Sequence, residues 1–473
     1  MPPFNRDEIV ALKIDSAAFE GKGIARVDGY VVFVSGGVPG DLVNARILKA
    51  KRDFAEAKVT EVVRPSPSRV TAPCRYFGIC GGCRWQHFDY LEQTRFKRQH
   101  VVDALERTAG IKVNVAETVI ADATYAYRNK IEMTFSENPF RIHEGDPVKV
   151  ALGFHAPARF DKTIDIDRCY LADEKTNAVV DWFRKAISPD SLLRKEIGLT
   201  IYDSKAHAGL LRFLTIRRSF SSDELMVSLV ILSEDDSVEK LAEKLHEDLP
   251  FVSTFASIIN RERAQIANGD IWKIHFGRGF ITEKLGGYSF RISPLSFFQT
   301  NTRQAEKLYA AALNGVRGKH KVIYDMYSGT GSLAIYMSRQ ADQLYGFEVV
   351  ASSVEDANAN ARLNDVTNIE FVRSDLLELF KGPDVKSNFS QRGIPLPDLV
   401  LLDPPRSGLH PKIASALHLL GADRIIYVSC NPITQARDVK EIVSHGYRAV
   451  SSQPVDMFPQ TYHIENVLVM ERI

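Results

Sequence analysis

Apolar and polar positions alternate in short runs over the first 66 residues of the chain. Glycines such as Gly29 and Gly40 separate several of these runs. Alternation over four to eight residues is typical of half-buried strands, and glycine suits the tight turns between them. The pattern predicts five short strands, and therefore a small β-barrel of the OB type over residues 1–66. The five runs are IVALKI, GIARV, YVVFV, DLVNARIL and FAEAKVTEVV.

Residues 67–290 follow no single period. The stretch YLEQTRFKRQHVVDALERTAG (90–110) has a helical pattern, whereas KIEMTF and GLLRFLTIRRS have the composition of strands. Because strands and helices occur here without regular alternation, we expect a mixed α+β middle domain. The two prolines of RPSPSR (64–69) predict a stiff linker between this domain and the barrel.

From residue 291 onward, strand-like runs alternate with helical stretches. This pattern predicts a doubly wound, mostly parallel sheet over residues 291–473, covered by helices on both faces. Ligands bind such sheets at the carboxyl ends of the strands, so these ends are the first place to look for a site. The first five predicted strands end in DMY, GFE, RSD, LLDPP and VSC.

The first strand end continues as DMYSGTGSL, with Gly329 and Gly331 in a tight turn before a helix. Glycines there either admit a ligand close to the backbone or serve the sterics of the turn alone. Glu348 ends the second strand, where a carboxylate can accept hydrogen bonds from ribose hydroxyls, and Asp375 ends the third. Ala334 occupies the place of the third glycine of a dinucleotide fingerprint, so S-adenosylmethionine fits the turn at least as well as NAD.

The fourth and fifth strand ends carry residues suited to chemistry. Asp403 begins a DPP turn, which methylases of exocyclic amines follow with an aromatic residue; Arg406 stands there instead and argues against that reaction. Cys430 lies at the fifth strand end, directly before a helix with Asn431 as N-cap. The positive end of this helix is expected to favour the thiolate, although a buried, inert cysteine is the alternative.

Glu465 stands just before the last apolar strand, NVLVM. A carboxylate in this position is either a solvated loop charge or, if it reaches the target of Cys430, a general base. Both interpretations are open from the sequence.

The other four cysteines form a separate group. Cys74, Cys80 and Cys83 lie in CRYFGICGGC, and Cys169 lies in DRCYL. An odd total of five in 473 residues does not indicate a disulfide framework, whereas four thiolates can hold either zinc or an iron–sulfur cluster.

Basic residues with interleaved aromatics surround the first three of these cysteines. Residues 69–98 contain six basic and two acidic side chains, a mixture that suits either single-stranded RNA or ordinary core packing. Arg212, Arg217 and Arg218 are weaker candidates for RNA contacts, because a solvated strand face explains them more simply.

Composition narrows the possible locations and partners. A formal net charge of +1 gives no whole-molecule attraction to nucleic acid or membranes. No stretch approaches the roughly 20 apolar residues of a membrane span, and MPPFNRDEIV has no apolar signal core. We therefore expect a cytoplasmic protein with no membrane partner.

Five stretches together resemble the RNA uracil-5 methyltransferase family. They are SPLSFFQTN, DMYSGTGSLAIYM, LLDPPRSGL, IIYVSCNPITQARD and DMFPQTYHIENV, in that order. The resemblance extends upstream through CRYFGICGGCRWQH, YRNKIEM and LGFHAPARF to a barrel that looks like a TRAM domain. It implies a TRAM barrel over 1–66, a middle domain with a four-cysteine cluster over 67–290, and a Rossmann-like class I methyltransferase domain over 291–473.

The resemblance also implies residue roles. Cys430 matches the nucleophile and Glu465 the general base. The four cysteines Cys74, Cys80, Cys83 and Cys169 match ligands of a [4Fe-4S] cluster, which favours that cluster over zinc. The family's S-adenosylmethionine-binding positions match Gln299, Tyr327, Ser332, Glu348, Asp375 and Asp403.

The implied activity is methyl transfer from S-adenosylmethionine to C5 of a uridine in RNA, through an adduct between Cys430 and uracil C6. The combination of barrel and four-cysteine set looks most like enzymes of 23S rRNA, so 23S rRNA is the favoured substrate and tRNA the alternative. A non-catalytic RNA-binding or assembly factor that keeps the fold is the rival interpretation. No obligate protein partner is expected.

Overall fold

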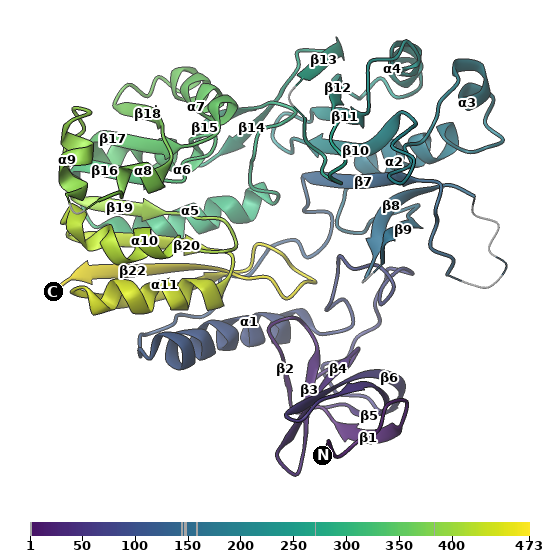
Figure 1. Ribbon diagram of the computed structural model, residues 1–473, viewed down its shortest axis with the longest axis horizontal. Coiled ribbons are helices and arrows are strands. Elements are labelled where there is room, and N and C mark those ends of the chain that lie inside the picture. The colour runs from purple at the N-terminus through teal and green to yellow at the C-terminus, as the bar shows by residue number, and fades with distance from the viewer. Residues whose placement is uncertain (1, 143–144, 146–148, 158, 270, 383) are drawn as a thin grey trace.

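The computed structural model describes residues 2–473 apart from 143–144, 146–148, 158, 270 and 383. The chain forms an N-terminal barrel, a middle sheet with helices, and a C-terminal sheet covered on both faces (Figure 1). No helix in the described part of the chain combines the length and apolar composition needed to cross a bilayer.

The N-terminal barrel is a sheet with the strand order β1-β5-β6-β4-β3-β2. Alternate residues such as Val32, Val34, Val43 and Ala45 point inward and are fully buried. This pattern confirms the predicted OB-like barrel and adds one two-residue strand, β2. The strands are β1 (Ile9–Lys13), β2 (Ser16–Ala17), β3 (Gly23–Val27), β4 (Tyr30–Ser35), β5 (Leu42–Ala50) and β6 (Phe54–Arg64).

The middle domain has the predicted α+β character, with a seven-stranded sheet in the order β13-β12-β11-β10-β7-β8-β9. Helices α2 and α4 pack on one face, where Phe183 and Leu241 join the core of β10 and β11. The strands are β7 (Lys130–Ser136), β8 (Ala151–Ala156), β9 (Arg159–Asp165), β10 (Leu211–Arg218), β11 (Leu225–Ile231), β12 (Thr254–Ile259) and β13 (Ile271–Phe276); the helices are α2 (Glu174–Ala186), α3 (Leu192–Ile197) and α4 (Ser237–Asp248).

One expectation for the middle domain is wrong. Every residue of β10 is buried, so Arg212, Arg217 and Arg218 do not lie on a solvated strand face. Their exposed fractions are 1%, 5% and 7%. The strand is central in its sheet and is covered on both sides, which alternation in the sequence could not reveal because the arginines themselves broke the pattern.

The C-terminal sheet has the order β18-β17-β16-β19-β20-β22-β21. Six of these strands share one direction, and β22 is antiparallel to both neighbours. The strands are β16 (His320–Met326), β17 (Ala341–Glu348), β18 (Ile369–Arg373), β19 (Leu399–Leu402), β20 (Arg424–Ser429), β21 (Tyr447–Val455) and β22 (Glu465–Arg472).

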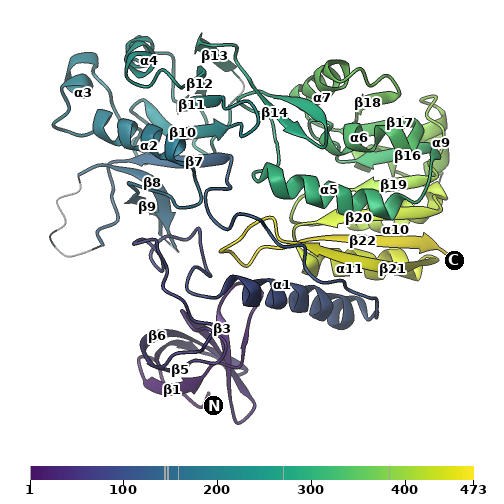
Figure 2. The ribbon, with the colours of Figure 1, turned by 180° about the vertical axis from the view of Figure 1, so that it is seen from behind.

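Helices cover both faces of this sheet, as predicted. Side chains of α5, α6 and α7 pack with Ile323 and Leu401 on one face, and those of α8 to α11 pack with Tyr324 and Leu402 on the other. Helices α10 and α11 lie in front of the sheet in Figure 1, and α5 lies in front of it in Figure 2. The helices are α5 (Thr302–Val316), α6 (Ser332–Met337), α7 (Ala351–Leu363), α8 (Leu376–Leu379), α9 (Val385–Ser390), α10 (Pro411–Ala416) and α11 (Pro432–Ser444), with short 3₁₀ turns at η2 (Ser338–Gln340) and η3 (Leu417–Leu420).

Two segments before residue 291 also pack into the C-terminal core. Helix α1 (Tyr90–Ala104), with the π turn η1 (Leu105–Ala109), places Val101 and Leu105 in the same cluster as Leu468 of β22. It runs between the barrel and α11 (Figures 1 and 2). The hairpin β14 (Ile281–Leu285) and β15 (Tyr288–Ile292) packs against α5 and α6. The sequence boundary at 291 therefore passes through a shared core.

Candidate active site at the carboxyl edge of the C-terminal sheet

The two glycines of the turn after β16 have different roles. A Cβ at Gly331, which has φ +78°, would lie 2.6 Å from Cζ of Phe371, so this glycine is required by packing. Gly329, with φ +52°, would place a Cβ in open space with no heavy atom within 4 Å. Tyr327 also has a positive φ, 80°. The turn therefore leaves room for a ligand at Gly329.

Carboxylates gather beside this turn. Asp325 is fully buried, and neither of its carboxylate oxygens has a hydrogen-bond partner in the described part of the chain. Burial, and next the charge of Asp403, raise the pKa of Asp325 to about 8. Burial raises the pKa of Asp403 to about 7. Burial, and next Asp403, raise the pKa of Glu465 well above its ordinary value.

The carboxylates beside the glycine turn favour one of the two cofactors that the turn could accept, S-adenosylmethionine or NAD. The buried Asp325 carboxylate and the neighbouring Asp403 favour a ligand with positive charge and disfavour the pyrophosphate of a dinucleotide. S-adenosylmethionine carries a sulfonium and an amino group, so Asp325 and Asp403 fit it. Asp325 was not singled out as a ligand residue in the sequence, although its place at the first strand end was a usable signal.

A cavity of about 530 Å³ lies beside the same edge. Three of the predicted cofactor residues, Tyr327, Glu348 and Asp375, line it. The Glu348 carboxylate accepts hydrogen bonds from the backbone N–H groups of Gly329 at 3.0 Å and of Val349 and Val350 at 2.9 Å. Glu348 is thus fixed at the mouth of the glycine turn, where a ribose would lie.

The other three predicted cofactor residues lie outside the lining of that cavity. The Ser332 hydroxyl lies 2.7 Å from the Tyr309 hydroxyl. Asp403 acts electrostatically on Cys430. Gln299 is buried, and its backbone carbonyl accepts a hydrogen bond from Asn129 Nδ2 at 2.9 Å.

Cys430 follows β20 and lies among charged side chains. Burial raises the pKa of its thiol to about 12; the charge of Glu465 adds to this effect, while the charge and hydrogen bond of Arg406 oppose it. Desolvation thus opposes the thiolate that is expected at the start of α11, and this preference stays a prediction. Arg406 is the group that favours the thiolate. The sequence signal for this role was the presence of Arg406 directly after DPP, where methylases of exocyclic amines have an aromatic residue.

Arg406 is held in place by His463. Arg406 Nη2 lies 2.6 Å from His463 Nδ1. Burial, and next the charge of Arg406, lower the pKa of His463 to about 3, so the imidazole is neutral and accepts the hydrogen bond. The loop that carries His463 also leads into Glu465, so one loop positions both the partner of Arg406 and the candidate base.

Helix α1 and the cysteine segment clamp this loop. Lys97 Nζ lies 2.6 Å from Asp456 Oδ1, and both side chains are fully buried. Gln93 Nε2 donates to Gln460 Oε1 at 3.0 Å. The backbone N–H groups of Arg84 and Trp85, just after Cys83, donate to the carbonyl of Gln460 at 3.1 and 3.0 Å. The cysteine segment therefore touches the loop that leads to Glu465.

The four remaining cysteines line one cavity of the middle domain. Burial raises the pKa of Cys80 to about 11 and of Cys83 to about 12, and the pKa values of Cys74 and Cys169 are raised for the same first reason. Among the described residues, no group of three or more His, Cys, Asp or Glu side chains is arranged to hold a metal ion. The expected metal centre thus has no support from the geometry beyond the shared cavity.

Comparison with known proteins decides the family. Residues 119–473 match the family model described as tRNA (uracil-5-)-methyltransferase. The chain belongs to this family. Residues 5–60 match the TRAM domain, which agrees with the barrel. The protein is therefore an S-adenosylmethionine-dependent RNA uracil-5 methyltransferase.

Similar proteins match this chain over nearly its full length. The chain is 40% identical to an uncharacterised RNA methyltransferase of Chlorobaculum tepidum, and the match covers 99% of this chain and 97% of the relative. It is 36% identical to one of Porphyromonas gingivalis, with 98% and 99% covered. The crystal structure of the Pyrococcus abyssi tRNA (uracil-54, C5)-methyltransferase with S-adenosyl-L-homocysteine is similar with a TM-score of 0.73 and 26% identity, covering 98% of this chain and 100% of that one.

Proposed function

We propose that this enzyme methylates C5 of a uridine in RNA through a covalent adduct with Cys430, and that Glu465 removes the C5 proton. The observation that carries the proposal is the grouping of Cys430, Glu465 and Asp403 within electrostatic range of one another, with Arg406 as the nearby cation that lowers the pKa of the thiol. A nucleophile, a base and a group that stabilises the thiolate therefore meet at one strand edge.

The Cys430 thiolate adds to uracil C6, and the electron pair of the C5–C6 bond becomes an enolate with nucleophilic C5. C5 then takes the methyl group, which S-adenosylmethionine supplies when bound. Glu465 accepts the C5 proton, the C5–C6 double bond forms again, and Cys430 leaves as thiolate. Because the target base must reach the half-buried sulfur of Cys430, it has to leave its stack, which costs a few kcal/mol.

The residues of the site fit the cofactor by charge and by space. Asp325 and Asp403 would hold its positively charged end, and Glu348 its ribose. Gly329 gives the backbone clearance that a bound ligand needs. Glu465 has the raised pKa expected of a base that must capture a proton from carbon near neutral pH.

For the substrate, 23S rRNA is our proposal, because the barrel and the four-cysteine set resemble enzymes of that RNA; such a substrate agrees with a cytoplasmic location. The alternative, tRNA, is favoured by the Pyrococcus abyssi structure, whose protein acts on tRNA.

We expect the purified enzyme to transfer labelled methyl groups to 23S rRNA that lacks 5-methyluridine, and to transfer fewer to tRNA of the same origin. Nucleoside mass spectrometry would identify 5-methyluridine and map the position. Preferential labelling of tRNA would replace the substrate proposal. Absence of label in both RNAs, from a protein that binds S-adenosylmethionine, would favour the rival RNA-binding factor.

The four cysteines Cys74, Cys80, Cys83 and Cys169 are proposed to hold a [4Fe-4S] cluster. A single zinc ion would need the sulfurs to converge at about 2.3 Å from it, whereas a cluster of four irons spans a wider cavity. Methyl transfer is a two-electron reaction without net redox change, so we assign the cluster the role of holding the segment that contacts Gln460.

Anaerobically purified protein is therefore expected to show broad visible absorption and to contain about one [4Fe-4S] cluster per chain. Cys80→Ser should remove most of it, because one of four ligands is lost. Cys430→Ser is the matched control and should leave the absorption unchanged. A colourless protein with stoichiometric zinc would contradict the assignment.

A further inference from the structure

The turn between β2 and β3 of the barrel packs against the rest of the enzyme. The Gly21 carbonyl accepts a hydrogen bond from Trp85 Nε1 at 3.1 Å. The Ala17 carbonyl lies 2.9 Å from Nε2 of His100 on α1. A Cβ at Gly21 would lie 2.9 Å from the Cβ of Arg84, so the two segments approach closely there. The turn is therefore fixed between α1 and the cysteine segment.

The same turn carries Phe19 to the loop between β21 and β22. The ring centroids of Phe19 and Tyr462 are 5.7 Å apart, and the rings meet edge to face at 74°. Phe19 meets the ring of His100 in a similar way, at 5.8 Å and 85°. Edge-to-face contacts are favourable and directional, so they fix the position of the Tyr462 ring. Phe19 thus joins the barrel to the loop that leads to Glu465.

Tyr462 is in turn next to the residues beside the nucleophile. The centroids of its ring and of the His463 ring are 4.1 Å apart. His463 Nδ1 lies 2.6 Å from Arg406 Nη2, and the charge of Arg406 favours the Cys430 thiolate. A continuous series of contacts therefore leads from Phe19 of the barrel to Cys430.

We propose that Phe19 of the barrel is a positioning residue for methyl transfer, which holds His463 in place through Tyr462. Arg406 then stays beside the sulfur that attacks the base. The inference rests on the proposed function, because it takes Cys430 as the nucleophile. A barrel that only captured RNA would affect KM, whereas a barrel that also positions this loop affects kcat.

Phe19→Ala is expected to lower kcat about threefold to tenfold, the range that one aromatic contact can supply. KM for RNA and the affinity for S-adenosylmethionine should stay unchanged, because the effect arises after both have bound. Phe33→Ala is the matched control, since the Phe33 ring packs against Phe54 of the same barrel at 5.7 Å. It should keep the wild-type kcat. A change in Phe19→Ala that is confined to KM would overturn the proposal.

Reaction of Cys430 with iodoacetamide tests the same point without RNA. Its rate follows the fraction of thiolate, which Arg406 increases. Mass spectrometry of the Cys430 peptide at one pH separates this thiol from the other four. Phe19→Ala should slow the reaction by about the factor by which it lowers kcat. An unchanged or faster reaction would show that Arg406 keeps its place without Phe19, and would overturn the proposal.

A double-mutant cycle decides whether Phe19 acts through Tyr462. In that case the double variant of Phe19→Ala and Tyr462→Ala is no slower than Tyr462→Ala alone, whereas independent effects would multiply. Tyr462→Phe keeps the ring and should retain the wild-type kcat. Multiplied effects in the double variant would contradict the proposed route.

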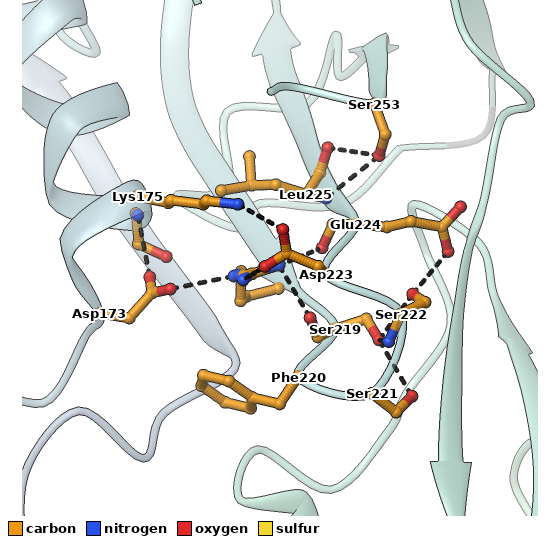
Figure 3. Close-up of polar contacts among 12 residues, drawn as sticks. Asp173, Lys175, Ser219, Phe220, Ser221, Ser222, Asp223, Glu224, Leu225 and Ser253 are labelled. Atoms are coloured by element: carbon orange, nitrogen blue, oxygen red, sulfur yellow. Dashed lines mark hydrogen bonds and ion pairs between the residues drawn. The ribbon is translucent and has the colours of Figure 1, made fainter. Parts of the chain in front are cut away.

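Arg218→Gln is the control for lost stability alone. Arg218 donates from Nε to Asp173 Oδ2 at 2.9 Å and also pairs with Asp223. Figure 3 shows Asp173 and Asp223 facing each other from the start of α2 and the loop after β10, with Lys175 completing the cluster. The variant removes the cation that joins them, so its melting temperature should fall while Cys430 reacts at the wild-type rate. A slower reaction here as well would assign the effect of Phe19→Ala to lost stability, and would overturn the proposal.

The wild-type adduct with 5-fluorouridine RNA is measured in parallel. Its absence would contradict the proposed function itself. A normal adduct, together with unchanged kcat and alkylation in Phe19→Ala, would overturn only the positioning role of Phe19, so the two failures are distinguishable.

Discussion

Cys430→Ala is expected to abolish the covalent adduct with 5-fluorouridine RNA and to lower methyl transfer by several orders of magnitude, since the step that activates C5 is lost.

Glu465→Gln is expected to accumulate the covalent adduct with RNA. It should trap Cys430 on ordinary uridine RNA, because the methylated adduct cannot lose its C5 proton, while turnover falls about 10²- to 10⁴-fold.

Denaturing gel electrophoresis with labelled RNA measures both results. Titration calorimetry with S-adenosylmethionine serves as the control, since Cys430→Ala should bind it as the wild type does. An adduct that persists in Cys430→Ala would remove Cys430 as the nucleophile. Normal turnover by Glu465→Gln would remove Glu465 as the base.

Asp325→Asn is expected to stabilise the free protein and to weaken S-adenosylmethionine binding by about tenfold to a hundredfold. In the folded state the pKa of Asp325 is raised to about 8. Between pH 4 and 8 the unfolded chain has lost this proton and the folded chain keeps it, so wild-type stability falls as the pH rises through this window. The variant lacks the penalty, and its advantage should grow by about 1.4 kcal/mol per pH unit, up to a few kcal/mol at pH 8.

Urea unfolding at pH 5 and pH 8 measures the stability, and calorimetry measures the binding. Asp375→Asn is the matched control, because Asp375 is an exposed carboxylate at the same sheet edge. It should weaken cofactor binding without the gain in stability. Wild-type affinity in Asp325→Asn would show that this carboxylate does not face the cofactor.

The fold followed from the sequence where burial was one-sided or regular. Apolar and polar residues alternate in the barrel strands, and the strands of the C-terminal sheet are continuous apolar runs, so both could be predicted from the sequence. Helix α1 could be predicted as a helix, but its position in the fold could not. Its buried side includes Gln93, Thr94, Lys97 and His100, so no apolar stripe indicated which domain it packs against.

The site was predictable in its positions and less so in its electrostatics. Strand ends indicated Glu348, Asp375, Asp403 and Cys430. Desolvation raises the pKa values of Asp403 and Cys430, and the charge of Glu465 adds to the effect on Cys430. Both effects arise only when strands far apart in the chain come together.

The buried pair of Lys97 and Asp456 joins residues that are 359 positions apart in the chain. At about 5 to 20 residues per second, synthesis of the intervening chain takes on the order of tens of seconds. During that time α1 has emerged while its partner strand β21 and the loop after it do not yet exist. The loop between β21 and β22 is thus among the last parts of the enzyme that can assemble, so a nascent chain has strands β16 to β20 before it has Glu465 in place.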